Sequence, residues 1–188
     1  RSIMGFTPPR GGSILLEGRE LSGLTPDRIA RLGVGLVPQG RRIFGSLTVR
    51  ENLKVGQRES AGRQGWSLSD VLGHFPRLDE RLQTSGKSLS GGEQQMLACS
   101  RALVGNPSVM LMDEPTEGLS PLFVRELGKL VQELRSRGTT VLLIEQNLGF
   151  ALRLADYVYV MNKGRIVYES TPEDIAHNDD IKARYLGM

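Results

Sequence analysis

The chain has 188 residues, of which 39% are hydrophobic and 24% charged, the composition of an ordinary globular protein rather than a disordered or fibrous one. Its 24 basic and 21 acidic side chains leave a net charge of only +3, which argues against a nucleic-acid partner. The longest apolar runs, at 141–144 and 157–161, are far shorter than the roughly 20 residues of a membrane helix, and a single cysteine excludes an intrachain disulfide.

The first half of the chain predicts short strands that alternate with capped helices. In chain order, the predicted elements are a strand at 13–17, a helix at 25–33, a strand at 34–37 that runs into a loop, a helix from 48, a surface loop at 56–66 and two short helices within 67–81. Thr25 followed by Pro26 is typical of a helix start, and Thr48 with Glu51 matches a capping box. Pro76 separates the last two helices, because proline interrupts helical hydrogen bonding.

The second half shows the same alternation more clearly. In chain order, the predicted elements are a helix at 93–104, a strand at 109–113, a helix from 120 to 138, a strand at 141–144, a helix at 147–154, a hairpin of 157–161 and 165–168, and a helical stretch from 171. Short, continuously apolar strands between amphipathic helices are typical of a parallel sheet that is covered on both faces. The sequence therefore predicts an α/β fold.

Two glycine-containing stretches resemble phosphate-binding loops but fail their patterns. Gly-Lys-Ser at 86–88 could end such a loop, but the pattern requires a glycine where this chain has Arg81, and no strand precedes it. The stretch 33–35 fails the dinucleotide-binding pattern, because Pro38 stands where that pattern needs a glycine. The given sequence therefore contains no complete phosphate-binding loop.

The start of the helix predicted at 93–104 has the chemistry of an anion site. Ser90 is a good N-cap, and Gly91 and Gly92 leave the first backbone N–H groups accessible at the positive end of the helix dipole. Taken alone, the same three residues are more typical of an ordinary helix cap. Both interpretations stay open at this point.

The strand predicted at 109–113 ends in two acids, Asp113 and Glu114. In α/β proteins, the carboxyl ends of parallel strands form the edge where ligands bind. An aspartate at that edge can hold Mg²⁺, and an adjacent glutamate can orient or deprotonate a water molecule. Two solvated acids at an ordinary strand end are the alternative interpretation.

These features occur together in one order, and in that order the chain resembles the ATP-binding subunits of ATP-binding-cassette (ABC) transporters. Leu-Ser-Gly-Gly-Glu at 89–93 resembles the family's LSGGQ signature, and Asp113 and Glu114 match its Walker B aspartate and catalytic glutamate. Residues 118–120 lie in the region of the D-loop, and Gln39 matches the Q-loop glutamine. The resemblance covers the whole chain.

The resemblance implies a P-loop NTPase-like sheet with helices on both faces, a helical subdomain and a small peripheral β hairpin. It implies a single nucleotide-binding domain over 1–188, with the Q-loop and the helical subdomain at about 40–85. The family's first strand and its Walker A phosphate loop would lie before Arg1. We therefore expect the chain to be a trimmed or incompletely recorded part of a longer protein.

The resemblance also implies ATP and Mg²⁺ as ligands and assigns roles to particular residues. Glu114 is expected to polarise the attacking water, and Gln39 to sense the metal and the phosphates. Gln146, at the place of the family's switch histidine, is expected to steady the water and the γ-phosphate. Asp113 and Gln39 are expected to hold Mg²⁺, in part through water, and Asp113 also to contact the nucleotide. The residues expected to bind the ATP of a second subunit are Ser90, Gly91, Gly92 and Glu93.

Within the family, the chain is most similar to importers of branched-chain amino acids, with urea and short-amide importers close to them. The stretches that carry this similarity are 37–44, 47–53, 93–97, 144–147 and 185–187. The expected function is ATP hydrolysis, in the complete protein, that energises a membrane importer. Expected partners are an identical or related ATP-binding subunit, integral membrane permease subunits and, indirectly, a solute-binding protein, with no nucleic acid. The expected location is the cytoplasmic face of the inner membrane of the cell.

Two alternative functions belong to other classes. A non-transport ATPase of the same fold would use ATP to clamp nucleic acid or remodel a protein complex, and a fragment without hydrolysis would only regulate or bind. Outside the site, Cys99 is predicted to be a small core residue and Trp66 a packing residue, with an interface role as the alternative for Trp66. Arg41 and Arg42 are predicted to lie in a solvated loop, with a contact to a nucleotide or a partner as the alternative.

Overall fold

The computed structural model describes residues 1–58 and 65–186 and divides into two compact units, Arg1–Ile144 and Glu145–Met188, each of which is described by itself. The loop predicted at 56–66 lies mostly outside the described residues. The single domain over 1–188 and the helical subdomain at 40–85 stay predictions. Among the described residues, no helix has both the length and the apolar composition needed to cross a bilayer.

A parallel sheet lies at the centre of the first unit. Its strands, in spatial order, are β3 (Val34–Val37), β4 (Val109–Asp113) and β5 (Thr140–Ile144). Val37 lies opposite Met112, and Asp113 lies opposite Ile144, so the carboxyl ends of the strands meet at one edge of the sheet. The predicted α/β fold and the predicted strands at 34–37, 109–113 and 141–144 are confirmed.

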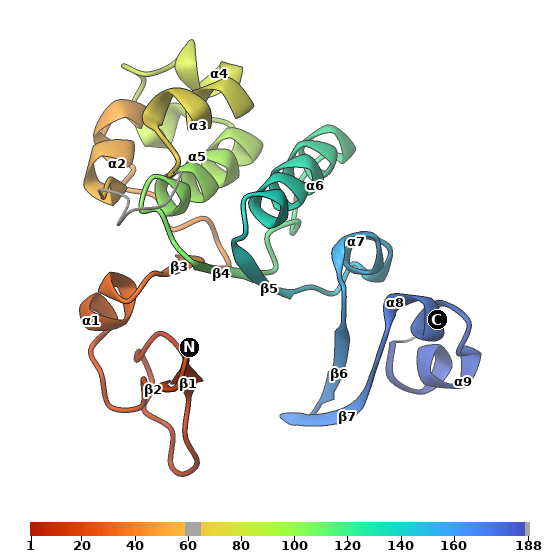
Figure 1. Ribbon diagram of the computed structural model, residues 1–188. Helices are drawn as coiled ribbons and strands as arrows, with labels where there is room; N and C mark the ends of the chain where they lie inside the picture. The colour runs from red at the N-terminus through yellow and green to blue at the C-terminus, as the bar shows by residue number, and fades with distance from the viewer. Residues whose placement is uncertain (59–64, 187–188) are drawn as a thin grey trace. The chain divides into compact units, whose positions relative to one another are not determined.

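Helices lie on both sides of this sheet (Figure 1). On one side, α1 (Pro26–Arg31) packs on β3, near the hairpin of β1 (Leu15–Leu16) and β2 (Arg19–Glu20). On the other side, α5 (Gly91–Leu103) contacts β3 and α6 (Pro121–Ser136) contacts β5. α5 and α6 therefore lie on one side of the sheet and α1 on the other.

The segment between β3 and α5 is built from short helices. They are α2 (Val49–Gly56), α3 (Leu68–His74), α4 (Pro76–Asp79) and the 3-10 helix η1 (Gly86–Ser88). α2, α3 and α4 pack against α5. The predicted capping box of Thr48 and Glu51 is present at α2, and Pro76 begins α4 as predicted. η1 is a single turn, which agrees with the rejection of 86–88 as a phosphate loop.

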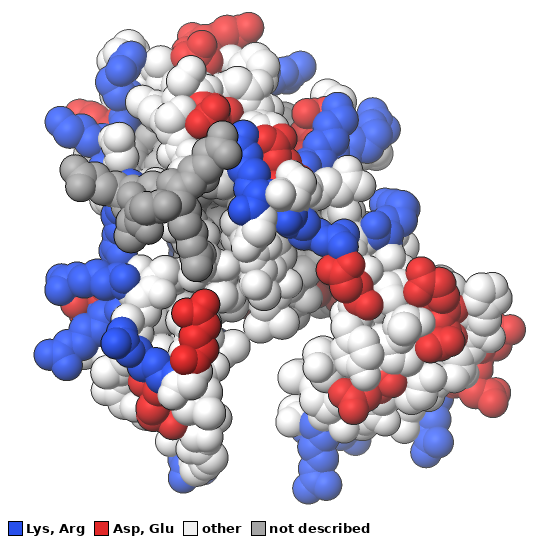
Figure 2. Space-filling model, in the orientation of Figure 1, with Lys and Arg blue, Asp and Glu red and all other residues white. Residues whose placement is uncertain are grey.

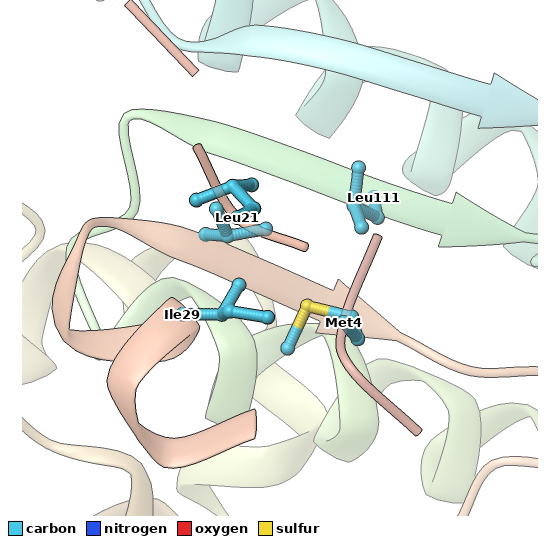
Figure 3. Close-up of a cluster of buried hydrophobic side chains, with 5 residues drawn as sticks. Met4, Leu21, Ile29 and Leu111 are labelled. Atoms are coloured by element: carbon cyan, nitrogen blue, oxygen red, sulfur yellow. The ribbon is translucent and has the colours of Figure 1, made fainter. Parts of the chain in front are cut away.

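A hydrophobic cluster attaches the N-terminal segment to the sheet. Met4, Leu21 and Ile29 pack against Val34 of β3 and Leu111 of β4, and all five side chains are buried (Figure 3). Burial of apolar surface contributes about 25 cal/mol for each Å² removed from water, so this cluster fixes α1 and the preceding turns beneath the sheet.

Two details of the first unit differ from the predicted elements. The strand predicted at 13–17 is only Leu15–Leu16, because Glu17 and Gly18, with φ of 50° and 79°, turn the chain into a hairpin. The apolar run of β5 predicts a buried strand, but Leu142 and Ile144 are 40% and 46% exposed. Side chains of a strand alternate between faces, and α6 covers one face of β5, whereas the opposite layer packs on β3. The face of β5 opposite α6 is therefore exposed at Leu142 and Ile144, although helices lie on both sides of the sheet as predicted.

The second unit combines short helices with a β hairpin. Its elements are α7 (Leu148–Leu154), β6 (Val158–Asn162), β7 (Arg165–Ser170), α8 (Pro172–Ala176), α9 (Asp179–Ile181) and the π-helix η2 (Lys182–Leu186). β6 and β7 pair antiparallel, and Lys163 and Gly164 form the turn with φ of 48° and 76°. Positive φ at both central residues is typical of a two-residue hairpin turn, and the predicted hairpin is confirmed.

Candidate active site

Asp113 and Glu114 lie at the carboxyl end of β4. Asp113 is the last residue of the strand, and the backbone N–H of Glu114 donates to the carbonyl of Ile144 on β5 at 2.9 Å. Glu114 has a φ of 45°, in the left-handed region that costs a residue with a side chain about 1–3 kcal/mol. The pairing of β4 with β5 therefore holds Glu114 in a strained backbone conformation, as is common at functional sites.

Gln39 follows β3 and reaches the same edge of the sheet. Its Nε2 donates to Oε2 of Glu114 at 2.9 Å and to Oε2 of Glu117 at 3.1 Å. Because β3 and β4 are neighbouring parallel strands, the residues that follow them emerge side by side. The structure thus brings together Gln39 and Glu114, which are 75 positions apart in the chain.

Glu117 belongs to the same cluster and is not among the site residues predicted from the sequence. Its backbone N–H donates to the carbonyl of Glu114 at 3.2 Å, which closes a turn over 114–117 and brings the second carboxylate back towards the first. An acid three residues after Glu114, across a turn that contains Pro115, is the sequence signal that could have found it.

The start of α5 is a capping box formed by Ser90 and Glu93. The backbone N–H of Ser90 donates to Oε2 of Glu93 at 2.8 Å, and the N–H of Glu93 donates to Oγ of Ser90 at 3.3 Å. Nε of Arg81 lies 3.5 Å from the other carboxylate oxygen of Glu93, a residue only 5% exposed. Burial raises the pKa of Glu93, but the hydrogen bonds from Ser90 and the charge of Arg81 outweigh it and hold this pKa below its usual value.

The two glycines at the start of α5 have different neighbours. A methyl group on Gly92 would overlap the ring of Phe123 on α6, whereas on Gly91 it would lie 2.8 Å from Nη2 of Arg41. The same nitrogen lies 3.8 Å from the corresponding position on Gly118. Gly92 is therefore required for packing, whatever binds at the helix start.

Arg41 lies between the start of α5 and the loop at Gly118. Its side chain is partly buried in this contact, contrary to the predicted solvated loop, because its backbone turns with a φ of 68° and directs the side chain onto Gly91. Arg42 is exposed, as predicted, and its carbonyl accepts a hydrogen bond from Nη2 of Arg101 at 2.6 Å.

Gln146 lies in the second unit, two residues after the end of β5. The backbone N–H of Asn147 donates to Oε2 of Glu145 at 3.3 Å, and Oδ1 of Asn147 accepts from the N–H of Phe150 at 3.0 Å. Gln146 therefore precedes a capped helix, α7. The catalytic role that the family resemblance gives to Gln146 stays a prediction.

The groups at the strand edge fit Mg²⁺. This ion prefers oxygen ligands and is usually held by one or two carboxylates together with water and the phosphates of a substrate. Asp113 supplies a carboxylate at the end of β4, and Gln39 supplies an amide oxygen in the loop after β3. Within residues 1–58 and 65–186, no group of three or more His, Cys, Asp or Glu is arranged to hold a metal ion.

The residues predicted to serve packing are interior. Cys99 is buried in α5, and burial raises the pKa of its thiol to about 12, so it is not a nucleophile at neutral pH. Trp66 is 6% exposed, with the guanidinium of Arg137 4.0 Å from its ring centre and the ring of His74 at 5.3 Å. Both predictions are confirmed.

Basic and acidic side chains are interspersed on the face of the Arg1–Ile144 unit that Figure 2 shows. A protein that tracks a nucleic-acid backbone concentrates its basic side chains in a stripe or patch. The interspersed basic and acidic side chains on this face are in keeping with the small net charge of +3.

Known proteins resemble this chain along almost its whole length. A family model described as "ABC transporter" matches residues 1–117. The high-affinity branched-chain amino acid transport ATP-binding protein BraG of Pseudomonas aeruginosa is 42% identical over 99% of this chain and 80% of its own length. LivG of Escherichia coli, described in the same words, is 34% identical over 98% of this chain and 80% of its own. The crystal structure of a nucleotide-free ATP-binding cassette from an ABC transporter superposes with a TM-score of 0.78 at 25% identity, over 99% of this chain and 77% of that one.

Proposed function

Because the chain belongs to the ABC transporter family and has the fold of its ATP-binding cassettes, we propose that it is the ATP-hydrolysing subunit of a membrane importer. The family and the fold class predicted from the sequence are thereby confirmed. The solutes that we propose are branched-chain amino acids, which the names of BraG and LivG state for those relatives.

One observation of the site carries the proposal, the contact of Gln39 with Glu114 at the carboxyl edge of the sheet. A carboxylate held at this edge by a neighbouring amide can accept a hydrogen bond from a water molecule and align it for attack. Phosphoryl transfer needs little covalent help from a protein, since positioning and charge stabilisation supply most of its catalysis. A fixed Glu114 supplies the positioning.

In the proposed reaction, water attacks the γ-phosphate of ATP, and ADP and inorganic phosphate leave. Glu114 polarises the water, Gln146 steadies the water and the γ-phosphate, and Gln39 reports the state of the phosphates to the loop that follows it. Asp113 and Gln39 would hold Mg²⁺, in part through water, and the ion would supply positive charge that offsets the charge of the phosphates.

The start of α5 serves a second subunit in this proposal. Ser90, Gly91 and Gly92 present N–H groups and the positive end of the helix dipole to the ATP bound by that subunit. Glu93 contributes by fixing the backbone of the helix start, because its carboxylate accepts a hydrogen bond from the N–H of Ser90. Each ATP is then enclosed between two subunits, which are identical or related.

The same proposal includes the other partners of the subunit and its location in the cell. Integral membrane permease subunits bind this subunit at the cytoplasmic face of the inner membrane, and a solute-binding protein delivers solute from the other side. Binding of ATP closes the two ATP-binding subunits, and hydrolysis reopens them, so that the permease alternates between two states.

The substitution Glu114→Gln in the full-length protein tests the proposed chemistry. It keeps the size of the side chain but removes the charge that polarises water, so we expect ATP turnover to fall by about 100-fold or more while ATP binding is retained. Phosphate release and nucleotide binding are the measurements. The control is Glu126→Gln, the same change on a partly buried acid of α6 that pairs with Lys129, which should leave both unchanged.

Transport is the second readout of the same variant. Cells that produce Glu114→Gln together with the partner subunits should lose accumulation of labelled leucine, isoleucine and valine. Rapid steady-state hydrolysis by the variant would contradict the role of Glu114. Lost hydrolysis with unchanged uptake would instead favour a non-transport ATPase.

A further inference from the structure

We propose that Glu117 is a positioning residue, which fixes the amide of Gln39 and, through it, the carboxylate of Glu114. The inference rests on the proposed function, because the reaction that Glu117 would affect is ATP hydrolysis. The evidence is the pair of hydrogen bonds from Nε2 of Gln39, at 2.9 Å to Glu114 and at 3.1 Å to Glu117.

The backbone of Glu117 is held by two successive turns. Its N–H donates to the carbonyl of Glu114 at 3.2 Å, and the N–H of Leu119 donates to the carbonyl of Thr116 at 3.1 Å. Gly118 takes a φ of 64°, a conformation that favours glycine, and α6 begins three residues later. The side chain of Glu117 is exposed but starts from this fixed loop, so its reach to Gln39 is set by the fold.

Two carboxylates determine the orientation of the Gln39 amide. Ionised carboxylates only accept hydrogen bonds, and the NH₂ group is the donor of a glutamine side chain. With Glu114 and Glu117 as acceptors, both hydrogens of that group are used, and Oε1 of Gln39 points away from the pair. Without Glu117, one hydrogen has no acceptor in the cluster, and the amide gains freedom to rotate.

The shared amide also holds two like charges together. The Oε2 atoms of Glu114 and Glu117 lie within about 6 Å of each other, a range in which carboxylates repel. The NH₂ group between them offsets this repulsion. Gln39 therefore cannot change its contacts without changing the interaction between the two acids, and this links the loop after β3 to the loop before α6.

The test is steady-state ATP hydrolysis by Glu117→Ala and Glu117→Gln in the full-length protein. For the alanine variant we expect kcat to fall by about threefold to tenfold, the loss of one hydrogen bond between exposed side chains, with KM for ATP within about twofold of wild type. Glutamine retains an acceptor oxygen and should restore most of kcat. Glu126→Ala, a partly buried acid on α6 whose partner is Lys129, is the matched control and should have no effect.

A double variant shows whether Glu117 acts through Gln39. Gln39→Ala removes the shared donor, so Gln39→Ala with Glu117→Ala should be no slower than Gln39→Ala alone. The inference would be overturned if the double variant lost kcat by the product of the two single losses, or if the kcat of Glu117→Ala equalled that of wild type. Thermal unfolding of each variant checks that the exposed substitutions leave the fold intact.

The two proposals fail in different ways. If Glu114→Gln abolishes turnover while Glu117→Ala matches wild type, ATP hydrolysis stands and the role of Glu117 falls. If Glu114→Gln hydrolyses ATP as fast as wild type, the proposed chemistry falls and the positioning role falls with it.

Discussion

At the scale of single residues, the two adjacent glycines at the start of α5 are constrained differently, one by packing and the other by what binds there. The sequence motif explains the absence of a side chain at both positions in the same way, by the close approach of a phosphate. In the structure, the ring of Phe123 also excludes a side chain at Gly92, whereas the neighbour of Gly91 is the guanidinium end of the Arg41 side chain. The two positions should therefore respond differently to the same substitution.

Gly92→Ala should lower the free energy of unfolding by about 1–3 kcal/mol, the usual cost of inserting a methyl group into a packed site. Gly91→Ala should cost clearly less, because the guanidinium of Arg41 can move aside. Urea denaturation measures both. Gly73→Ala, in α3 with open space around the added methyl, is the control and should not destabilise. Equal losses at 91 and 92 would show that Phe123 does not set the constraint.

Capping boxes organise the sequence at the scale of helices. Thr48 with Glu51, Ser67 with Asp70 and Ser90 with Glu93 each satisfy two backbone N–H groups that a helix start leaves without intrahelical partners. The box at α5 differs from the others because Glu93 is buried and also pairs with Arg81. The start of α5, the proposed contact with the second subunit's ATP, is thus the most firmly fixed of the three.

Glu93 should make the stability of the unit depend on pH in acid. Its pKa is lower in the folded protein than in the unfolded chain, so its contribution is fully present above about pH 4.5 and is lost as the pH falls through the folded pKa. Glu93→Gln should therefore be less stable than wild type at neutral pH, and the difference should shrink in acid. Urea midpoints from pH 7 to pH 3 test this. A difference independent of pH would assign the effect to packing rather than ionisation.

At the scale of the whole molecule, the proposal concerns ATP-dependent dimerisation through the start of α5. Ser90→Arg removes a helix cap and places a long cation at the positive end of α5, where the ATP of a second subunit is proposed to bind. In full-length protein that also carries Glu114→Gln, we expect Ser90→Arg to abolish ATP-dependent dimerisation, measured by light scattering, with monomer ATP affinity retained.

Ser67→Arg is the matched control for this prediction. Ser67 caps α3 with the same capping box, so the substitution removes the same type of cap without altering the start of α5. Dimerisation should persist in this control. An ATP-dependent dimer that survives Ser90→Arg would remove the start of α5 from the interface.

The sequence by itself determined the features that depend on neighbours along the chain. Helix caps such as Thr48, hairpin turns such as Lys163-Gly164 and the apolar strand 109–113 are set by local hydrogen bonding, backbone conformation and periodicity. The order of motifs was enough to indicate the family. The place of Asp113 and Glu114 at the end of a strand indicated a ligand edge, and the family resemblance added Gln39.

Only the tertiary structure decided which of these residues meet and which surfaces are covered. Gln39 and Glu114 come together, with Glu117, because β3 and β4 are adjacent in the sheet, and strand order is not written in any local stretch of sequence. Leu142 and Ile144 are exposed because burial depends on which helix packs on which strand, whereas an apolar run is the same wherever it lies.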